Sequence, residues 1–155
     1  MKVGLISDTH GLLRPAVLEQ LAGVDVILHA GDVGNSGILA ELGALAPVHA
    51  VWGNTDGFEV RAHTAERVAL ELEGWRVLVT HGDELGSPRP ASLRDAYPDA
   101  DIIVYGHTHT ALLEECGGAL IVNPGAAGPA RFRLPPSIAV LELGPGTRAV
   151  RHIQL

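Results

Sequence analysis

Seven residues with carboxylate, amide or imidazole side chains stand out in this sequence, because each comes just after a short apolar run. Carboxylate, amide and imidazole groups without any thiolate are the ligands that hard or borderline divalent ions prefer. The pattern therefore indicates a metal site, with manganese, iron, zinc, cobalt and nickel as candidates. The seven residues are Asp8, His10, Asp32, Asn54, His81, His107 and His109.

Seven ligands are too many for one ion that keeps a position open, but they fill two sites of about four each if Asp32 bridges them. Two divalent ions, two carboxylates and a bridging hydroxide leave the site with a charge of about +1, which favours an anionic substrate. Coordination lowers the pKa of water from 15.7 toward about 7, so hydroxide is available near neutral pH. The sequence predicts hydrolytic chemistry at a pair of metal ions.

Each of these motifs has a simpler interpretation when it is taken alone. The triplet that begins at Asp8 is also typical of a turn with a helix cap, and Gly31-Asp32 and Gly53-Asn54 are ordinary turn dipeptides. Alternate histidines in Gly106-His107-Thr108-His109 are a more specific signal, because a structural role there would prefer apolar residues. All of them in order, each at the end of an apolar run, favour the metal site.

The ligands must be positioned by the elements that precede them. Apolar runs that stop at polar clusters are typical of buried strands, and in open α/β sheets ligands bind beyond the carboxyl ends of the strands. The predicted strands are Val3 to Ile6, Val26 to Leu28, Val48 to Trp52, Val77 to Thr80, Ile102 to Tyr105 and Leu120 to Val122. The predicted helices are Pro15 to Ala22, Ser36 to Leu45 and Ala91 to Ala96. Hairpins are predicted at Glu73-Gly74, at Gly117-Gly118 and at Gly144-Pro145-Gly146.

Length and composition agree with one soluble unit. A chain of 155 residues with 46% hydrophobic and 19% charged residues can build one core, so we expect a single domain over 1–155. A net charge of −7 argues against long nucleic acid as a partner, because affinity for its backbone comes from Lys and Arg. One cysteine, Cys116, cannot form an internal disulfide, and no apolar run suits a signal peptide or a membrane span. We expect a cytoplasmic protein that does not bind membranes; homo-oligomerisation stays open.

At these residues the sequence resembles the calcineurin-like metallophosphoesterase superfamily, whose motifs DxH, GDxx, GNxx, H and GHxH occur here in that order. The resemblance covers nearly the whole chain. Its narrower features are typical of the small bacterial and archaeal phosphodiesterase branch: HAGD at 29–32, GNTD at 53–56, HG at 81–82 and NPG at 123–125.

The resemblance implies an α/β fold, a four-layer sandwich of two mixed β-sheets flanked by helices, and two metal ions, often manganese or nickel. It implies one ion held by Asp8, His10, Asp32 and His109, and another held by Asp32, Asn54, His81 and His107. It also suggests Arg131, Asn123 and, with less support, Arg14 as contacts of the substrate phosphate.

Three positions depart from the family pattern. Thr55 stands where larger relatives carry a histidine that protonates the leaving group, Asp83 places a carboxylate where small relatives often have histidine, and Ala126 lacks the hydroxyl of the usual NPGS. Protonation of the leaving group then falls to water or to Asp56, which could instead orient Asn54 or cap a turn.

The prediction is an enzyme that uses a hydroxide bridging two metals to hydrolyse phosphate esters of small or medium-sized molecules, above all phosphodiesters. The alternative is a non-catalytic interaction scaffold, because the chain also resembles a eukaryotic retromer subunit of this fold that has lost ligands. All seven ligands are present here, which favours the enzyme. His29 lies within an apolar run, so we expect a hydrogen-bonded core histidine and not a ligand.

Overall fold

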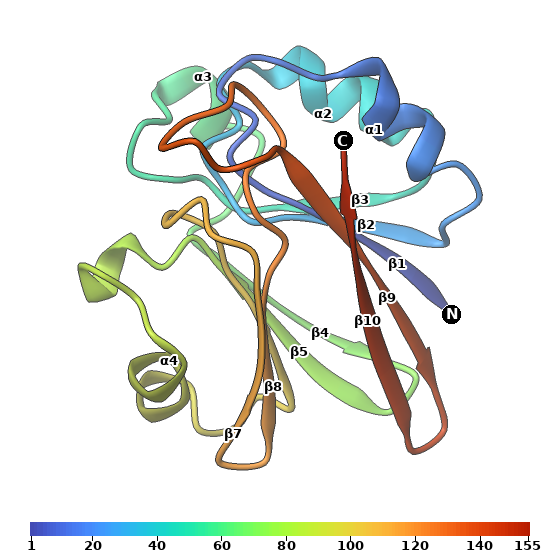
Figure 1. Ribbon diagram of the computed structural model, residues 1–155, viewed down its shortest axis with the longest axis vertical. Coiled ribbons are helices and arrows are strands. Elements are labelled where there is room, and N and C mark those ends of the chain that lie inside the picture. Colours follow the sequence, from blue (N-terminus) through green and yellow to red (C-terminus); the bar gives the residue numbers. More distant parts are fainter.

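The computed structural model describes residues 1–155 and consists of two five-stranded sheets that pack face to face (Figure 1). Three helices cover the outer face of one sheet and a fourth helix covers the outer face of the other (Figure 1). The four-layer sandwich of mixed sheets expected from the sequence is thereby confirmed.

The first sheet has the order β10-β9-β1-β2-β3. Strands β1, β2 and β3 are parallel, with β3 at the edge, whereas β9 pairs antiparallel with β1, and β10 pairs antiparallel with β9. The strands are β1 (Lys2–Ile6), β2 (Val26–His29), β3 (Val48–Ala50), β9 (Ser137–Gly144) and β10 (Thr147–Gln154).

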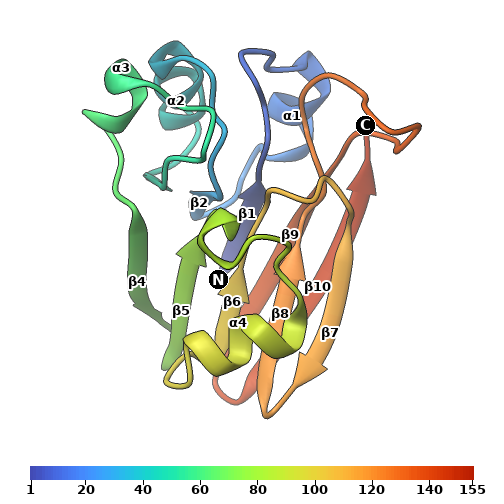
Figure 2. The same cartoon turned by 90° about the vertical axis from the view of Figure 1, so that its left-hand side faces the viewer.

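The second sheet has the order β4-β5-β6-β8-β7, with β5, β6 and β8 parallel and the two outer strands antiparallel to their neighbours. The strands are β4 (Arg67–Leu72), β5 (Trp75–Thr80), β6 (Ile102–Val104), β7 (Leu112–Cys116) and β8 (Ala119–Asn123). In Figure 2 the strands β1, β5 and β6, each of which is followed by a predicted ligand, end at one common edge of the sandwich.

The helices are short: α1 (Pro15–Gln20), α2 (Ser36–Gly43), α3 (Phe58–Arg61), α4 (Pro90–Ala96) and a 3-10 turn at Asp83–Leu85. Asn35 caps α2, since its side chain accepts a hydrogen bond from the Ile38 N–H. The sequence did not predict α3, because four residues are too few for a helical period to show. No helix is long and apolar enough to cross a membrane.

Alternation along the strands produces three hydrophobic clusters: one between the sheets, one between the first sheet and its helices, and a smaller one under α4. In β1, Val3 and Leu5 enter the core between the sheets, while Ile6 packs on the helix side. The predicted hairpins are confirmed: Glu73 and Gly74 have φ of 51° and 82°, and Gly117 and Gly118 have φ of 56° and 82°, the left-handed values of tight hairpin turns.

The core between the sheets should dominate stability. Leu5 is fully buried at the centre of the first sheet, so Leu5→Ala is expected to lower the free energy of unfolding by about 2–5 kcal/mol. Leu113→Ala is the matched control, since that side chain is 47% exposed on an outer strand. Urea denaturation measures both variants, and equal losses would contradict this assignment of the core.

Candidate metal centre

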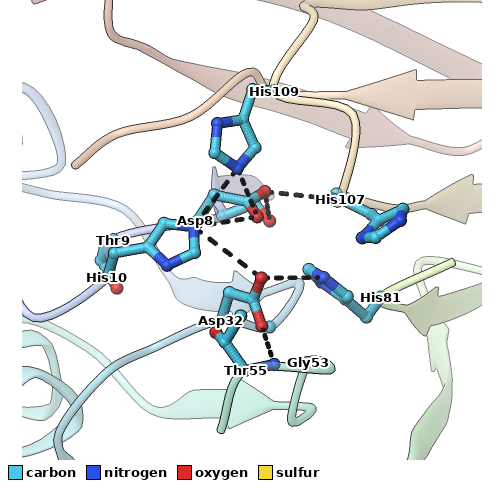
Figure 3. Close-up of polar contacts among 12 residues, drawn as sticks. Asp8, Thr9, His10, Asp32, Gly53, Thr55, His81, His107 and His109 are labelled. Carbon is cyan, nitrogen blue, oxygen red and sulfur yellow. Dashed lines mark hydrogen bonds and ion pairs between the residues drawn. The ribbon is translucent and has the colours of Figure 1, made fainter. Parts of the chain in front are cut away.

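The loops that follow β1, β2, β3, β5 and β6 meet at one edge and bring the seven predicted ligands into a continuous network. All of them except Asn54 are labelled in Figure 3. Two groups have ligand atoms within 4.8 Å of one another. One group is Asp8, His10 and His109, and the other is Asp8, Asp32 and His81.

Asp8 lies at the centre of the first group. Its Oδ1 is 3.3 Å from His109 Nε2 and 3.7 Å from His10 Nε2, and the two imidazole nitrogens are 3.2 Å apart. The three atoms therefore converge on one point, as the ligands of one cation would.

Whereas Asp8 belongs to both groups, Asp32 belongs to the second group and also faces His10 of the first. Its Oδ2 is 3.2 Å from His81 Nε2 and 3.8 Å from His10 Nε2, so this one oxygen faces both sides. On the far side, Asn54 Oδ1 lies 3.1 Å from His81 Nε2 and 3.1 Å from His107 Nδ1. This is the arrangement expected if Asp32 is shared between two ions.

In each carboxylate one oxygen is held by the protein and the other is directed at histidines. Asp8 Oδ2 accepts hydrogen bonds from the Ser7 hydroxyl (2.6 Å) and the His107 N–H (3.2 Å). Asp32 Oδ1 accepts one from the Thr55 N–H at 3.0 Å. Asp8 Oδ1 is buried and has no hydrogen-bond partner, which is costly unless a cation compensates it. The donor set and this oxygen fit a divalent metal.

Backbone contacts prepare His81 as a ligand. Its Nδ1 donates to the Ala30 carbonyl at 2.7 Å, which leaves Nε2 toward Asp32. Burial lowers the pKa of His81, but the hydrogen bond to Asp32 and the charges of Asp8 and Asp32 outweigh it and raise the pKa to about 9. Burial likewise raises the pKa of Asp32, yet the contact with His81 holds it well below its usual range. For His10, burial dominates over both carboxylates and lowers the pKa.

His29 is the hydrogen-bonded core histidine that the sequence predicted. Its Nδ1 accepts from the Gly31 N–H at 3.1 Å, so Nε2 carries the proton toward Thr9 Oγ1, 3.0 Å away. The Thr9 hydroxyl donates in turn to the Val33 carbonyl at 2.7 Å. Complete burial lowers the pKa of His29 to about 4, so a neutral ring ties the first two ligand loops together.

Five of the ligands have a left-handed backbone, which is uncommon for residues other than glycine. Such conformations cost roughly 1–3 kcal/mol each and persist where the surrounding structure enforces them. Asp and His are enriched in the left-handed region relative to other residues, but the residue types alone do not indicate which of them adopt it. The five φ values are 54° at Asp8, 46° at His10, 53° at Asp32, 70° at His107 and 61° at His109.

Two motif glycines are required by close contact with the carboxylates. A Cβ on Gly53 would lie 2.1 Å from Asp32 Oδ1, and one on Gly106 would lie 2.7 Å from Asp8 Oδ2. Either side chain would push a carboxylate out of place. This explains why glycine precedes Asn54 and His107.

Asp56 does not have the geometry of a proton donor to the leaving group. It is only 4% exposed, and its two oxygens accept hydrogen bonds from the N–H groups of Val33, Gly34 and Gly53. The carboxylate thus joins the loops after β2 and β3 and positions the segment that carries Asn54. The sequence left this alternative open, and the contacts favour it.

Two predicted phosphate contacts also have structural partners. Asn123 is fully buried, donates to the Gly106 carbonyl and to Thr108 Oγ1, and accepts from the Gly125 N–H, so it supports the loop that carries His107. Arg14 donates twice to the Gly128 carbonyl, at 3.2 and 3.1 Å. Both predictions overlooked these contacts, since the carbonyls of Gly106 and Gly128 are backbone atoms distant in sequence from Asn123 and Arg14.

Arg131 differs from these two. It is exposed in the loop between β8 and β9. Burial is the main cause of the lowered pKa of His10; the two carboxylates raise this pKa, and the positive charge of Arg131 lowers it further.

Of the departures from the family pattern, Thr55 is exposed, Ala126 is buried, and Asp83 is exposed in the 3-10 turn and belongs to neither ligand group.

The role of Ser7 was missed from the sequence. Its hydroxyl fixes the oxygen of Asp8 that faces away from the histidines, and it is completely buried. A serine directly before the first ligand was visible in the sequence, but one small polar residue at a strand end carries no specific signal.

Comparison with known proteins gives the same chemistry. The calcineurin-like phosphoesterase superfamily domain matches residues 1–146. A probable metallophosphoesterase of Methanothermobacter thermautotrophicus is 35% identical over 153 residues, covering 92% of this chain and 86% of that protein.

Solved structures are similar over the same extent. An archaeal phosphodiesterase superimposes with a TM-score of 0.83 at 26% identity and covers 100% of both chains. Vacuolar protein sorting 29 from Cryptosporidium parvum gives a TM-score of 0.81 at 26% identity and covers 99% of this chain and 97% of that one. With its motifs, its fold and these relatives, the chain belongs to the calcineurin-like phosphoesterase superfamily and is a metal-dependent phosphoesterase.

Proposed function

We propose that the protein hydrolyses phosphodiesters of small or medium-sized molecules at a centre of two divalent ions. The observation that carries the proposal is a pair of carboxylate oxygens inside the site that are directed at histidines. Asp8 Oδ1 is buried without a hydrogen-bond partner, and Asp32 Oδ2 faces histidines on both sides. Two cations would compensate both oxygens.

In this proposal the ions are manganese, with nickel, iron, zinc or cobalt as alternatives. When bound, the ions lower the pKa of water toward neutrality and neutralise charge on the phosphoryl group. The first set of ligands is Asp8, His10, Asp32 and His109, and the second is Asp32, Asn54, His81 and His107.

The protein's own groups orient the substrate and the ligands. Arg131 is exposed close enough for its charge to act on His10, which supports a contact with the substrate phosphate. Asp56 and Asn123 position loops and do not face the substrate in this proposal. Thr55 offers no proton near neutral pH, so solvent protonates the leaving group, and good leaving groups are favoured.

An interaction scaffold is the second candidate, supported by the similarity to vacuolar protein sorting 29. A scaffold has no need for a buried carboxylate oxygen without a partner, nor for five ligands held in left-handed conformations. These costly features support the enzyme.

Metal content tests the two-ion centre. Protein stripped with a chelator and dialysed against manganese is expected to hold two ions per chain by elemental analysis, because Asp8 belongs to both ligand groups and Asp32 faces a histidine of each. Asn54→Ala should reduce the content toward one, and Asp95→Asn, an exposed acid outside the site, should leave it at two. Full activity with a stable content of one ion per chain would contradict the proposal of a two-ion centre.

Asn54 provides a ligand test that spares the core, since its side chain is exposed. We expect Asn54→Ala to lower kcat by about 100-fold or more. Mutation of residues that only hydrogen-bond to a metal ligand already lowers metal affinity or activity by about 10- to 100-fold. Asn35→Ala is the matched control: it removes the cap of α2 and costs about 0.5–2 kcal/mol of stability without changing kcat. The measurements are turnover of bis-nitrophenyl phosphate with saturating manganese and thermal unfolding. Near-native turnover of Asn54→Ala would remove it from the ligand set.

Leaving-group preference tests the role of Thr55. Activated diesters such as bis-nitrophenyl phosphate should be cleaved with higher kcat/KM than alkyl monoesters such as glycerol phosphate. General acid catalysis contributes about 10²- to 10⁴-fold, and its absence penalises alkoxides selectively. Thr55→His should therefore raise rates on poor leaving groups more than on good ones. Comparable kcat/KM on both classes in the wild-type protein would mean that another group already acts as the acid.

A further inference from the structure

The loop between β8 and β9, residues 124–136, is fixed at its base against the first ligand loop. Arg14 donates two hydrogen bonds to the Gly128 carbonyl, and a Cβ on Gly128 would come within 2.1 Å of the Thr9 carbonyl oxygen. The loop therefore has a defined place beside the metal ligands, and its tip is held there through its base.

The tip presents an aromatic ring to solvent next to a metal ligand. Phe132 is 78% exposed, and its ring centroid is 6.0 Å from that of His109, with an angle of 62° between the planes. Both Phe132 and Arg133 have a left-handed backbone, with φ of 55° and 58°. Exposing a large apolar ring forgoes burial, so packing within the chain does not explain its position.

The same loop supplies apolar walls on another side of His109. Leu134 and Pro135 line a pocket of about 480 Å³, and His109 and His152 line it as well. An organic group attached to a phosphate at the metal centre would contact the ring of Phe132 or these walls where the group extends out of the site.

The loop is also positively charged, although the chain carries a net charge of −7. Arg131 and Arg133 are the neighbours of Phe132 in the sequence, and both are exposed. A loop that carries an exposed aromatic ring and two cations suits a ligand that combines a planar apolar group with an anionic phosphate.

We propose that Phe132 is a specificity-determining residue, which stacks on a planar aromatic group of the phosphate ester while Leu134 and Pro135 form the adjoining wall. The preferred substrates are then diesters that carry an aromatic ring, as opposed to purely alkyl diesters. This inference rests on the proposed phosphodiesterase function and names its substrate class.

Two diesters with the same leaving group test the proposal: phenyl p-nitrophenyl phosphate and methyl p-nitrophenyl phosphate, both with manganese. Phe132→Ala is expected to lower the phenyl-to-methyl ratio of kcat/KM by about 2- to 10-fold relative to the wild-type protein. The change should lie in KM, because stacking is equal in the ground state and the transition state. Intrinsic reactivity cancels between the proteins, and Phe132→Tyr, which retains the ring, should restore the ratio.

A direct binding measurement makes the test independent of turnover. Calorimetric titration of the manganese-loaded protein with phenylphosphonate and methylphosphonate should show a preference for the phenyl compound that Phe132→Ala reduces by a similar factor. These ligands carry one organic group each, so no leaving group competes for the ring. Phe58→Ala is the matched control, since Phe58 is 89% exposed on α3, on the opposite side of this edge (Figure 2).

Unchanged preferences in Phe132→Ala, or an equal loss in Phe58→Ala, would overturn the proposal. If neither diester is hydrolysed while the phenylphosphonate preference still depends on Phe132, the phosphodiesterase function fails and the aromatic subsite stands.

Discussion

Two buried carboxylates, Asp8 and Asp32, impose the constraint on which the site depends. Burying an ionised carboxylate costs several kcal/mol unless positive charge or hydrogen bonds compensate it. In each residue one oxygen is satisfied, by Ser7 and the His107 N–H or by the Thr55 N–H, and the other is directed at histidines. The folded protein therefore bears the free-energy cost of burying two carboxylates in an arrangement that divalent cations would stabilise.

The candidate ligands come from both sheets, which would link metal binding to the sandwich itself. Loops after β1, β2 and β3 carry Asp8, His10, Asp32 and Asn54, whereas loops after β5 and β6 carry His81, His107 and His109. The core between the sheets must close before these groups meet. Any ion bound there would in turn favour the closed sandwich, since binding to the folded state adds to stability.

In the proposed function, selectivity among phosphate esters depends on parts of the molecule that the core does not constrain. Thr55 follows the candidate ligand Asn54 but is exposed, and the loop between β8 and β9 exposes two arginines and Phe132, whose ring lies beside His109. The same scaffold could change its substrates by altering these residues while the carboxylates, histidines and close-packed glycines stay in place.

The amino-acid sequence by itself predicted the set of candidate ligands and determined the strands that precede them, the three hairpins and the core role of His29, because these features depend on residue type and local spacing. The tertiary structure alone decided that Asp56 and Asn123 fix loops, and that Arg14 holds a carbonyl. It also decided the left-handed ligands and the place of Phe132 beside His109. The physical reason is that the roles of Asp56, Asn123 and Arg14 depend on backbone N–H and C=O groups, several of them far away along the chain, and nearly every residue carries those groups whatever its side chain. The place of Phe132 depends on the course of its loop in the folded chain.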